Sequence, residues 1–466
     1  MPASPARGVA YRVLRAVNAG RADLPSALER GRGALADDRD RGLAAEIAIG
    51  TLRWRGALDH LIEHYSGRPL ARLDPEIADI LRMGAYQLLH LGRVPAAVAV
   101  DEAVILARQS RKRSAAGLVN AVLRAIARDR DRPPLPPRPS VPGEQDGQPS
   151  GALDAEAALD YLSITLSHPR WLAKRWLKRL GFAGAEAWAL FSNTPAPLTL
   201  RANTLMTRAD ALAAELAGLG VAVRRTERAP EGLVVTSGNV FRTGLAGSGR
   251  FLIQDEGSQL VTLMVGARPG ATVLDGCASP GGKTVGLAGE MGNRGLLVAG
   301  DTRPRRLDLL RRTLTSSGAT CARIVRLDLR DRAPFGAVFD RVLVDAPCSG
   351  LGTIRRDPEI RWRRREDDLA RFAGDQRKML ASAAEAVAPG GWLVYATCSS
   401  EPEENEEVVG QFLTGHAEFA AVSPREASGV LSPCLHGVLG DDLYLRTEPG
   451  RHGLEAFFAA ALRRIR

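Results

Sequence analysis

Residues 272–284, TVLDGCASPGGKT, combine a short apolar run with a glycine-rich turn and the start of a helix. The apolar run over 272–275 is typical of a buried strand. Glycines at 281 and 282 allow a tight turn that brings the backbone close to a ligand. The helix expected over 281–290 would offer backbone N–H groups to a carboxylate. The stretch therefore predicts a ligand-binding turn at the edge of an open α/β sheet.

This turn does not match the phosphate-binding loop of nucleoside triphosphatases. That motif places a glycine five residues before its Gly-Lys-Thr triplet. Here the triplet is residues 282–284, position 277 is a cysteine, and Gly276 lies one residue too early. The sequence therefore argues against a nucleoside triphosphatase.

From residue 251 to residue 466, short apolar runs alternate with helical stretches. This alternation predicts a doubly wound parallel sheet of the α/β class. The expected strands are 272–275, 296–301, 324–328, 339–345 and 391–397, and the expected helices are 281–290, 304–317 and 366–388. Three strands end in an aspartate, namely Asp301, Asp328 and Asp345. A single such aspartate is usually a loop cap, but three beside a glycine turn indicate contacts to a nucleoside.

Two cysteines lie in unlike loops that each follow an apolar run. Cys348 belongs to DAPCSG at 345–350, and Cys398 belongs to YATCSS at 395–400. Because the carboxyl ends of parallel strands share one edge of a sheet, we expect both thiols at one site.

The five cysteines are odd in number and far apart, which argues against a disulfide framework and suits a reducing compartment. Buried cysteines are usually inert, and we expect this of Cys321 and Cys434. Cys277 is expected to support the glycine turn rather than to react. Neither a Cys-x-x-Cys pair nor a histidine cluster accompanies them, so no metal site is expected.

The sequence before residue 251 predicts three parts of different composition. The first shows amphipathic helical periodicity, and it contains a proline-started helix at Asp74-Pro75. The second is rich in proline and then in glycine and polar residues, as in a linker. The third mixes strand and helix patterns and suits a small α/β domain that contacts RNA. These parts are residues 1–130, 131–158 and 159–250, and the helical stretches of the first are 6–19, 39–65, 95–109 and 114–128.

The chain is basic, with a formal net charge of +10. Residues 1–132 carry 22 Arg and Lys against 15 Asp and Glu, so most of the excess lies in the helical part. A polyanion such as nucleic acid is the expected partner. The sequence has no apolar run of membrane-spanning length and no signal-peptide pattern, so we expect a cytoplasmic protein without a membrane partner.

A run of arginines follows the Cys348 loop, at positions 355, 356, 361, 363, 364 and 365. Such a cluster suits the phosphates that flank a target base. Acidic residues at 366–368 equally suit salt bridges on a helix. We expect RNA contact from Arg355 and Arg356, and either base stacking or packing from Trp362.

Motifs along the chain resemble those of the RNA cytosine-5 methyltransferases, and specifically the bacterial RsmB (Sun) enzymes of 16S ribosomal RNA. Residues 5–130, with LVNAVLR at 118–124, resemble the NusB-type RNA-binding domain of these enzymes. The chain departs from the family at Ser279, where alanine is usual, and at Ala456, where glycine is usual. The other matching stretches are LRAN (200–203), QDEGSQ (254–259), CASPGGKT (277–284), DAPCSG (345–350), IRRDPEIRW (354–362), ATCS (396–399) and EEN (403–405).

The resemblance implies an all-α NusB-like domain followed by an α/β, Rossmann-like, S-adenosylmethionine-dependent methyltransferase domain over 251–466. It implies methylation of carbon 5 of a cytosine in 16S ribosomal RNA. Cys398 would attack the base, and Cys348 would assist release. Asp345 would contact the ring, and Lys283 would contact Asp345 or the base. The implied cofactor-binding residues are Cys277, Ala278, Ser279, Pro280, Gly281, Gly282, Lys283, Asp301, Asp328 and Asp345.

The expected substrate is small-subunit ribosomal RNA that is protein-free or in an early assembly intermediate, because the target base must leave its stack. The enzyme is expected to be a monomer. Two alternatives stay open, namely a transfer RNA cytosine-5 methyltransferase and a non-catalytic RNA-binding assembly or antitermination factor. The side chains of Cys348, Cys398, Asp345 and Lys283 argue against the second alternative.

Overall fold

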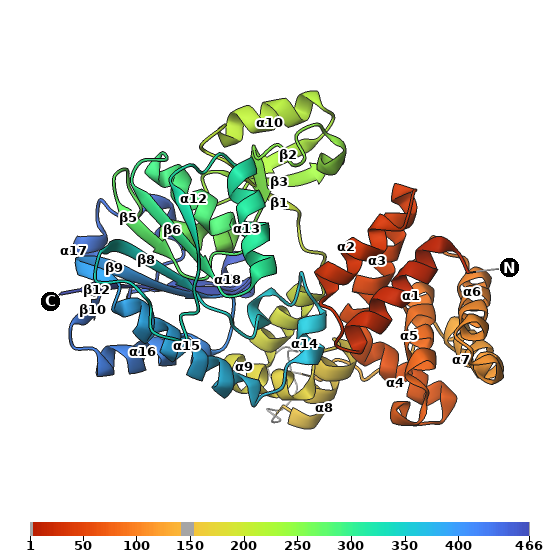
Figure 1. The fold of residues 1–466 in the computed structure, drawn as a ribbon. Coiled ribbons are helices and arrows are strands. Elements are labelled where there is room, and N and C mark those ends of the chain that lie inside the picture. The colour runs from red at the N-terminus through yellow and green to blue at the C-terminus, as the bar shows by residue number, and fades with distance from the viewer. Residues whose placement is uncertain (1–2, 141–152, 466) are drawn as a thin grey trace. The chain divides into compact units, whose positions relative to one another are not determined.

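The computed structural model describes residues 3–140 and 153–465, which fold into two compact units (Figure 1). The helical unit comprises Met1–Pro195 and Ile354–Glu366, and the α/β unit comprises Ala196–Thr353 and Asp367–Arg466. The chain thus leaves the α/β unit after Thr353 and returns to it at Asp367. The four-part division drawn from the sequence is a finer one and stays a prediction.

The N-terminal part of the helical unit contains seven α-helices around one apolar core. The long stretch expected over 39–65 is two helices, because the backbone of Trp54 leaves the helical conformation between them. Helix α2 is absent from the sequence prediction, since its two glycines and few apolar residues give a weak helical pattern. The seven are α1 (Pro5–Asn18), α2 (Leu24–Gly33), α3 (Asp38–Arg53), α4 (Arg55–Ser66), α5 (Pro75–His90), α6 (Ala96–Gln109) and α7 (Ala116–Arg128).

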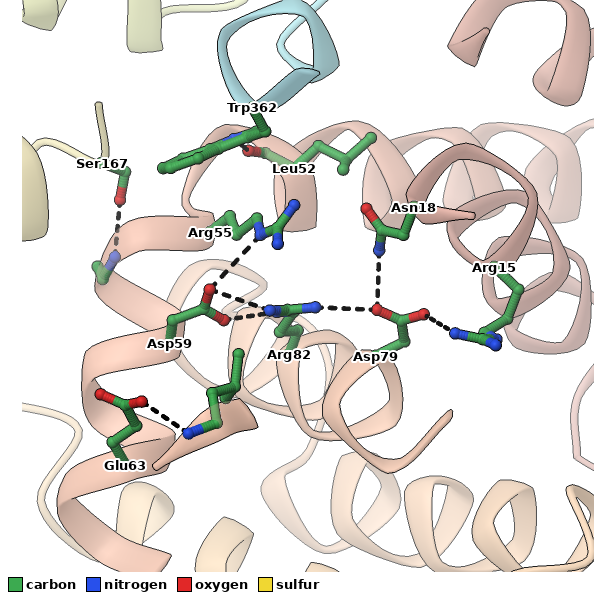
Figure 2. Close-up of polar contacts among 12 residues, drawn as sticks. Arg15, Asn18, Leu52, Arg55, Asp59, Glu63, Asp79, Arg82, Ser167 and Trp362 are labelled. Atoms are coloured by element: carbon green, nitrogen blue, oxygen red, sulfur yellow. Dashed lines mark hydrogen bonds and ion pairs between the residues drawn. The ribbon is translucent and has the colours of Figure 1, made fainter. Parts of the chain in front are cut away.

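A buried ion network joins α1, α4 and α5 (Figure 2). Arg82 donates to the two oxygens of Asp59 at 2.5 and 3.0 Å and to Asp79 at 3.0 Å. Asp79 also accepts from Asn18 at 2.8 Å and from Arg15 at 3.0 Å. Each buried charge therefore has a partner of opposite sign, the condition under which a folded chain tolerates buried ions.

The described part of the proline-rich segment lies against the helices. Leu135 packs on the apolar core of the helical unit, and the carbonyl oxygen of Pro136 accepts from Thr165 at 2.6 Å. Helix α8 (Ala155–Asp160) begins inside the range predicted as linker, and α9 (Arg170–Asn193) follows it. The rest of that range, 141–152, lies outside the described residues. Residues 133–140 are thus an extended segment that packs against the helical unit.

Segment Ile354–Glu366 is held in the helical unit by its arginine and tryptophan side chains. The buried guanidinium of Arg361 donates to the carbonyl oxygens of Ser167, Ser192 and Ile354 and to Asn193 Oδ1, at 2.9–3.3 Å. Trp362 Nε1 donates to the Leu52 carbonyl at 2.6 Å (Figure 2). For Trp362, packing is therefore observed, and Arg361 is a structural residue instead of an exposed phosphate contact.

The α/β unit begins with a small antiparallel sheet in the order β2-β3-β1-β4. Helix α10 (Ala209–Gly218) packs on it through Leu212 and Leu216. The sequence predicts β1, β3 and α10 but not the short strands β2 and β4. The four strands are β1 (Thr199–Ala202), β2 (Ala222–Arg225), β3 (Gly232–Ser237) and β4 (Phe251–Ile253).

The large sheet has the order β10-β12-β9-β8-β5-β6-β7, with β11 paired to β12. Strands β5 to β9 are mutually parallel, as predicted, and β12 runs antiparallel to β9. The apolar pattern does not predict β12, because the alanine-rich stretch FFAAALRR favours neither strand nor helix. The strands are β5 (Thr272–Asp275), β6 (Leu296–Asp301), β7 (Ala322–Arg326), β8 (Phe339–Asp345), β9 (Val387–Thr397), β10 (Phe419–Ala421), β11 (Leu445–Thr447) and β12 (Phe457–Arg464).

Apolar cores cover both faces of the large sheet. Alternate residues of one strand serve the two cores, as Val273 and Leu274 of β5 do. The first core takes in α11 (Glu256–Leu263), α12 (Gly282–Met291) and α13 (Pro304–Ser316), and the second takes in α15 (Asp368–Ala384) and α16 (Glu406–Gly415). The predicted doubly wound α/β class is therefore confirmed. Among the described residues, none of the helices has both the length and the apolar character to cross a membrane.

Replacing Arg361 by Met should lower the free energy of unfolding of the helical unit by about 2–4 kcal/mol, because three buried carbonyls lose their donor. Chemical denaturation of the full chain, followed by tryptophan fluorescence, would measure this. Arg30→Met is the matched control, since Arg30 is an exposed arginine of α2 in the same unit. Equal midpoints for the two variants would contradict a structural role for Arg361.

Candidate active site

The glycine turn between β5 and α12 is fixed by contacts to neighbouring strands. Ala278 N–H donates to the carbonyl of Gly300 in β6 at 2.8 Å. Gly281 has a φ of 111°, a conformation that glycine adopts readily. The Ser279 hydroxyl donates to the Arg306 carbonyl at 3.1 Å, a bond that the family's usual alanine could not make. The peptide bond between Ser279 and Pro280 is cis.

A buried carboxyl group, Asp275, lies under this turn. Its Oδ2 accepts from the Thr284 hydroxyl at 2.7 Å, and its Oδ1 has no hydrogen-bond partner among the described residues. Burial raises the pKa of Asp275 to about 7, and the charge of Asp345 adds to the rise. The sequence pattern does not single out this residue, because an acid at the end of an apolar run indicates only where a strand ends.

The other strand-end acids differ in their surroundings. Asp301 is buried and accepts from the Thr302 N–H at 2.8 Å and from the Ser279 N–H at 3.3 Å. Asp328 lies two residues beyond β7, which ends at Arg326 instead of at Asp328. Both Asp328 oxygens accept from Arg330, at 3.0 and 2.6 Å, which lowers the pKa of that carboxyl. Asp301 is therefore the acid that touches the turn directly.

Lys283, in the first turn of α12, forms an ion pair with Asp345 at the end of β8. The Lys283 Nζ to Asp345 Oδ2 distance is 2.6 Å. Burial opposes the charge of Lys283, but the Asp345 carboxylate outweighs it, so the pKa of Lys283 is raised. Cys398 is among the groups that, when ionised, would raise it further. The site therefore contains a stable ammonium group within electrostatic reach of the Cys398 sulfur.

The two loop cysteines meet at the carboxyl edge of the sheet. Strands β8 and β9 are parallel neighbours, with Asp345 opposite Ala396. The Sγ atoms of Cys348 and Cys398 lie 3.2 Å apart, and both cysteines are free. The hydrogen bond to Cys398, followed by burial, raises the pKa of Cys348 well above its usual value. Cys348 thus holds its proton more strongly than an ordinary thiol does, and its sulfur lies within hydrogen-bonding distance of the Cys398 sulfur.

Glu404 links the two cysteine loops through one fully buried carboxylate. From the Cys348 loop it accepts the Ser349 N–H at 2.8 Å and the Ser349 hydroxyl at 2.5 Å. From the Cys398 loop it accepts the Ser399 hydroxyl at 2.5 Å, and from α15 it accepts Gln376 Nε2 at 3.0 Å. The sequence offers EEN at 403–405 as a family match but does not indicate this role, because three of the four donor groups belong to Ser349 and Gln376, which are far away in the sequence.

Backbone contacts complete the support of the Cys398 loop. Gly352 N–H donates to the Cys398 carbonyl at 3.0 Å, and Ala456 N–H donates to the Gly352 carbonyl at 3.0 Å. A side chain at Gly352 would come within 2.1 Å of the Ala456 carbonyl oxygen, so this approach requires glycine. At 456 itself, alanine in place of the family's glycine is accommodated, since its main chain makes the contact.

The remaining cysteines and the predicted RNA-binding arginines make other contacts. Burial raises the pKa values of Cys277, Cys321 and Cys434, which agrees with unreactive thiols. Arg355 belongs to the helical unit, where it donates to the Pro195 carbonyl at 2.8 Å and its guanidinium lies 4.3 Å from the centre of the Phe191 ring. RNA contact by Arg355 and Arg356 stays a prediction.

Family models match three parts of the chain. The model described as 16S rRNA methyltransferase RsmB/F matches residues 262–463, and the NusB family model matches residues 4–128. The ferredoxin-like domain of RsmF/B-like methyltransferases matches residues 168–240. The predicted NusB-like and methyltransferase parts are therefore confirmed.

Relatives match the chain over nearly its whole length. Ribosomal RNA small subunit methyltransferase B of Pseudomonas putida is 36% identical over 463 residues, which is 98% of each chain. The protein of the same name from Pseudomonas syringae pv. tomato is 33% identical over 98% of this chain and 97% of its own.

Solved structures share the fold. The crystal structure of PH0851 has a TM-score of 0.79 and 27% sequence identity and covers 99% of both chains. A methyltransferase homologue from Pyrococcus horikoshii has a TM-score of 0.54 and 28% identity, over 66% of this chain and 99% of its own.

Replacing Glu404 by Gln should make Cys348 reactive at a lower pH, because the Glu404 charge contributes to the raised pKa of that thiol. Alkylation of Cys348 by iodoacetamide across a pH series, read by peptide mass spectrometry, would measure the shift. Glu403→Gln is the control, because its neighbour Glu404 keeps the charge that faces the loops. The same pH midpoint in Glu404→Gln and wild type would refute the assigned electrostatic role.

The stability of the protein should depend on the titration of Asp275. Its pKa is about 7 when folded and near 3.8 when unfolded, so the folded state holds an extra proton between these values. The wild type should therefore lose stability relative to Asp275→Asn as the pH rises from 4 to 7, by up to about 1.4 kcal/mol per pH unit. Above pH 7 the difference should level off. Denaturant unfolding of both proteins from pH 4 to 8 tests this, and parallel curves would contradict it.

Proposed function

The chain belongs to the RsmB family of small-subunit ribosomal RNA methyltransferases, and on that premise we propose that it methylates carbon 5 of a cytosine through a covalent adduct with Cys398. The observation that carries this proposal is the pair of free sulfurs 3.2 Å apart at the carboxyl edge of the sheet. A methyltransferase acting on a base nitrogen or a ribose hydroxyl needs no such pair. Methylation of carbon 5 of cytosine needs one thiolate, because that carbon is a poor nucleophile until a thiolate adds to carbon 6. The second thiol is then available for product release.

We assign the attacking thiolate to Cys398. The raised pKa of Cys348 favours that thiol as the one that keeps its proton, and we take it as the donor in the contact between the two sulfurs. The buried ammonium of Lys283 attracts negative charge on the same sulfur. Both contacts support Cys398 as the nucleophile, because a thiolate is the form of a cysteine that reacts.

Asp345 is placed to hold the base while the adduct forms. Its ion pair with Lys283 fixes one carboxylate oxygen at the end of β8, two residues before Pro347 in the Cys348 loop. A carboxylate in that position can bond the polar edge of the cytosine ring near N3. Lys283 therefore serves twice, since it orients Asp345 and stabilises the Cys398 thiolate.

Release of the product requires loss of the carbon 5 proton and cleavage of the bond between carbon 6 and sulfur. As that bond breaks, its electron pair returns to Cys398. We assign the release step to Cys348, whose sulfur is in contact with Cys398 before attack. Cys348 must pass its own proton to water before its thiolate can accept the proton from carbon 5 of the cytosine.

S-adenosylmethionine, the expected cofactor, supplies an electrophilic methyl group on a sulfonium when bound. The residues of the turn fit such a ligand, because Asp275 Oδ1 is buried without a hydrogen-bond partner in the described part of the chain and can accept from an ammonium group. The N–H groups at the start of α12 suit its carboxylate, and Asp301 suits its ribose. We propose that residues 277–283, with Asp275, Asp301, Asp328 and Asp345, hold it.

The RNA must present the cytosine outside its stack, which costs least in loops or in partly assembled RNA. We therefore propose protein-free 16S ribosomal RNA or an early assembly intermediate as the substrate. Transfer RNA is the alternative substrate with the same chemistry, and the experiment below includes it.

Cys398→Ala should abolish methyl transfer, whereas Cys348→Ala should trap a protein–RNA adduct that survives denaturation, because attack proceeds and release fails. Unmodified 16S ribosomal RNA and transfer RNA would each be incubated with the proteins and S-adenosylmethionine labelled in its methyl group. Label is measured as 5-methylcytosine after nucleoside digestion, and the adduct is measured on denaturing gels. Cys434→Ala is the control for loss of a thiol outside the site.

The outcomes separate the alternatives. Label on transfer RNA alone would keep the chemistry and change the substrate. Label on 16S ribosomal RNA in a nucleoside other than 5-methylcytosine would refute the proposed position. An adduct formed by Cys398→Ala would reverse the roles of the two cysteines.

A further inference from the structure

A hollow of about 930 Å³ lies on the helical unit where α6 ends and α7 begins. Arginines supply three of its six lining residues, and no acidic residue lines it. The lining residues are Ile105, Arg108, Gln109, Arg111, Arg113 and Ser114. We call this hollow the arginine groove.

The three arginines of the groove have no ion pair or hydrogen bond to another side chain among the described residues. Other arginines of the same unit are paired, as Arg15 and Arg82 are with Asp79. Lys112, between Arg111 and Arg113, is also paired, with Asp74 at 3.0 Å. The groove thus concentrates three positive charges that no described carboxylate neutralises.

Arg111 occupies a backbone position that normally favours glycine. Its φ is 62°, in the left-handed region, and the N–H of Lys112 donates to the Ala107 carbonyl at 3.2 Å. This bond closes the C-terminal end of α6, where the left-handed residue is usually glycine. A side chain at this position is unfavourable for the turn. The turn itself therefore gives no reason for an arginine here.

We propose that the arginine groove binds phosphodiester groups of the RNA substrate. Guanidinium groups match phosphate oxygens in geometry and charge, and three around one hollow suit successive phosphates. An acidic protein partner fits less well, because Ile105 is the single apolar residue of the lining and protein interfaces have an apolar centre. The inference rests on the proposed RNA substrate, and it adds a second contact region, on the helical unit.

Arg111→Gly separates binding from folding. Glycine relieves the left-handed backbone, so the variant should unfold at the same temperature as the wild type or higher. It should nevertheless bind RNA more weakly, because one phosphate contact is lost. A variant that is as stable as the wild type and binds RNA equally well would show that Arg111 has no part in binding.

The full groove variant combines Arg108→Gln, Arg111→Gly and Arg113→Gln. Equilibrium binding of the full chain to a fluorescent 16S ribosomal RNA fragment is measured by anisotropy without cofactor, at several salt concentrations. We expect at least a tenfold loss of affinity, and the slope of log affinity against log salt should fall by about 2, at about 0.7 per phosphate contact on a single strand. The control removes the same number of charges from exposed arginines outside the groove, with Arg30→Gln, Arg39→Gln and Arg93→Gln.

Because binding is measured without the cofactor, this test is independent of methyl transfer. If the groove variant and the control variant show the same loss of RNA affinity and the same fall in salt slope, only net charge matters and the proposed role of the groove is overturned. If neither variant loses affinity, it is likewise overturned. Polyglutamate serves as the probe for an acidic protein partner. If the groove variant keeps its affinity for RNA but loses its affinity for polyglutamate, the groove binds an acidic protein and the RNA proposal fails. Failure of methyl transfer with the groove effect intact would refute the proposed reaction alone.

Discussion

The candidate site depends on one buried carboxylate, that of Glu404, between the ends of two parallel strands. Parallel pairing of β8 with β9 brings the two loops to the same edge of the sheet, but it does not fix their distance. Glu404 does so, by accepting from Ser349 in one loop and Ser399 in the other. A buried carboxylate is costly unless several donors satisfy it, and here four donor groups converge on it. The 3.2 Å contact between the sulfurs follows from this arrangement.

Two chemically identical thiols have different surroundings. The hydrogen-bonding contact with Cys398, burial and the charge of Glu404 all raise the pKa of the Cys348 thiol. Cys398 lies within reach of the Lys283 charge, which Asp345 holds in place. Burial, together with the charge of Asp345, raises the pKa of Asp275 below the turn. Burial and neighbouring groups thus raise the pKa values of Cys348 and Asp275, whereas the ion pair with Asp345 keeps Lys283 charged.

Segment Ile354–Glu366 belongs to the helical unit, and some of its arginines stabilise the structure there. Ile354–Glu366 follows directly on the Cys348 loop, and Arg361 and Trp362 hold it among the helices. Such a segment ties the α/β unit to the helical unit at both of its ends. A sequence pattern does not distinguish this use from phosphate binding, because an arginine that bonds buried carbonyls and one that bonds phosphates have the same local spacing.

Elements and motifs that depend on neighbours along the chain were predictable from the amino-acid sequence. The apolar runs gave β5, β6 and β8 at their observed bounds, the glycine turn with α12, most N-terminal helices, and the two cysteine loops at strand ends. Tertiary structure decided what depends on distant partners. These features are the break at Trp54, the antiparallel β12, the unpartnered oxygen of Asp275, the burial of Arg361 and the four donors of Glu404. The reason is physical: periodicity reports which face of an element is apolar, whereas the charge and hydrogen bonds of a buried polar group are set by residues far away in the sequence.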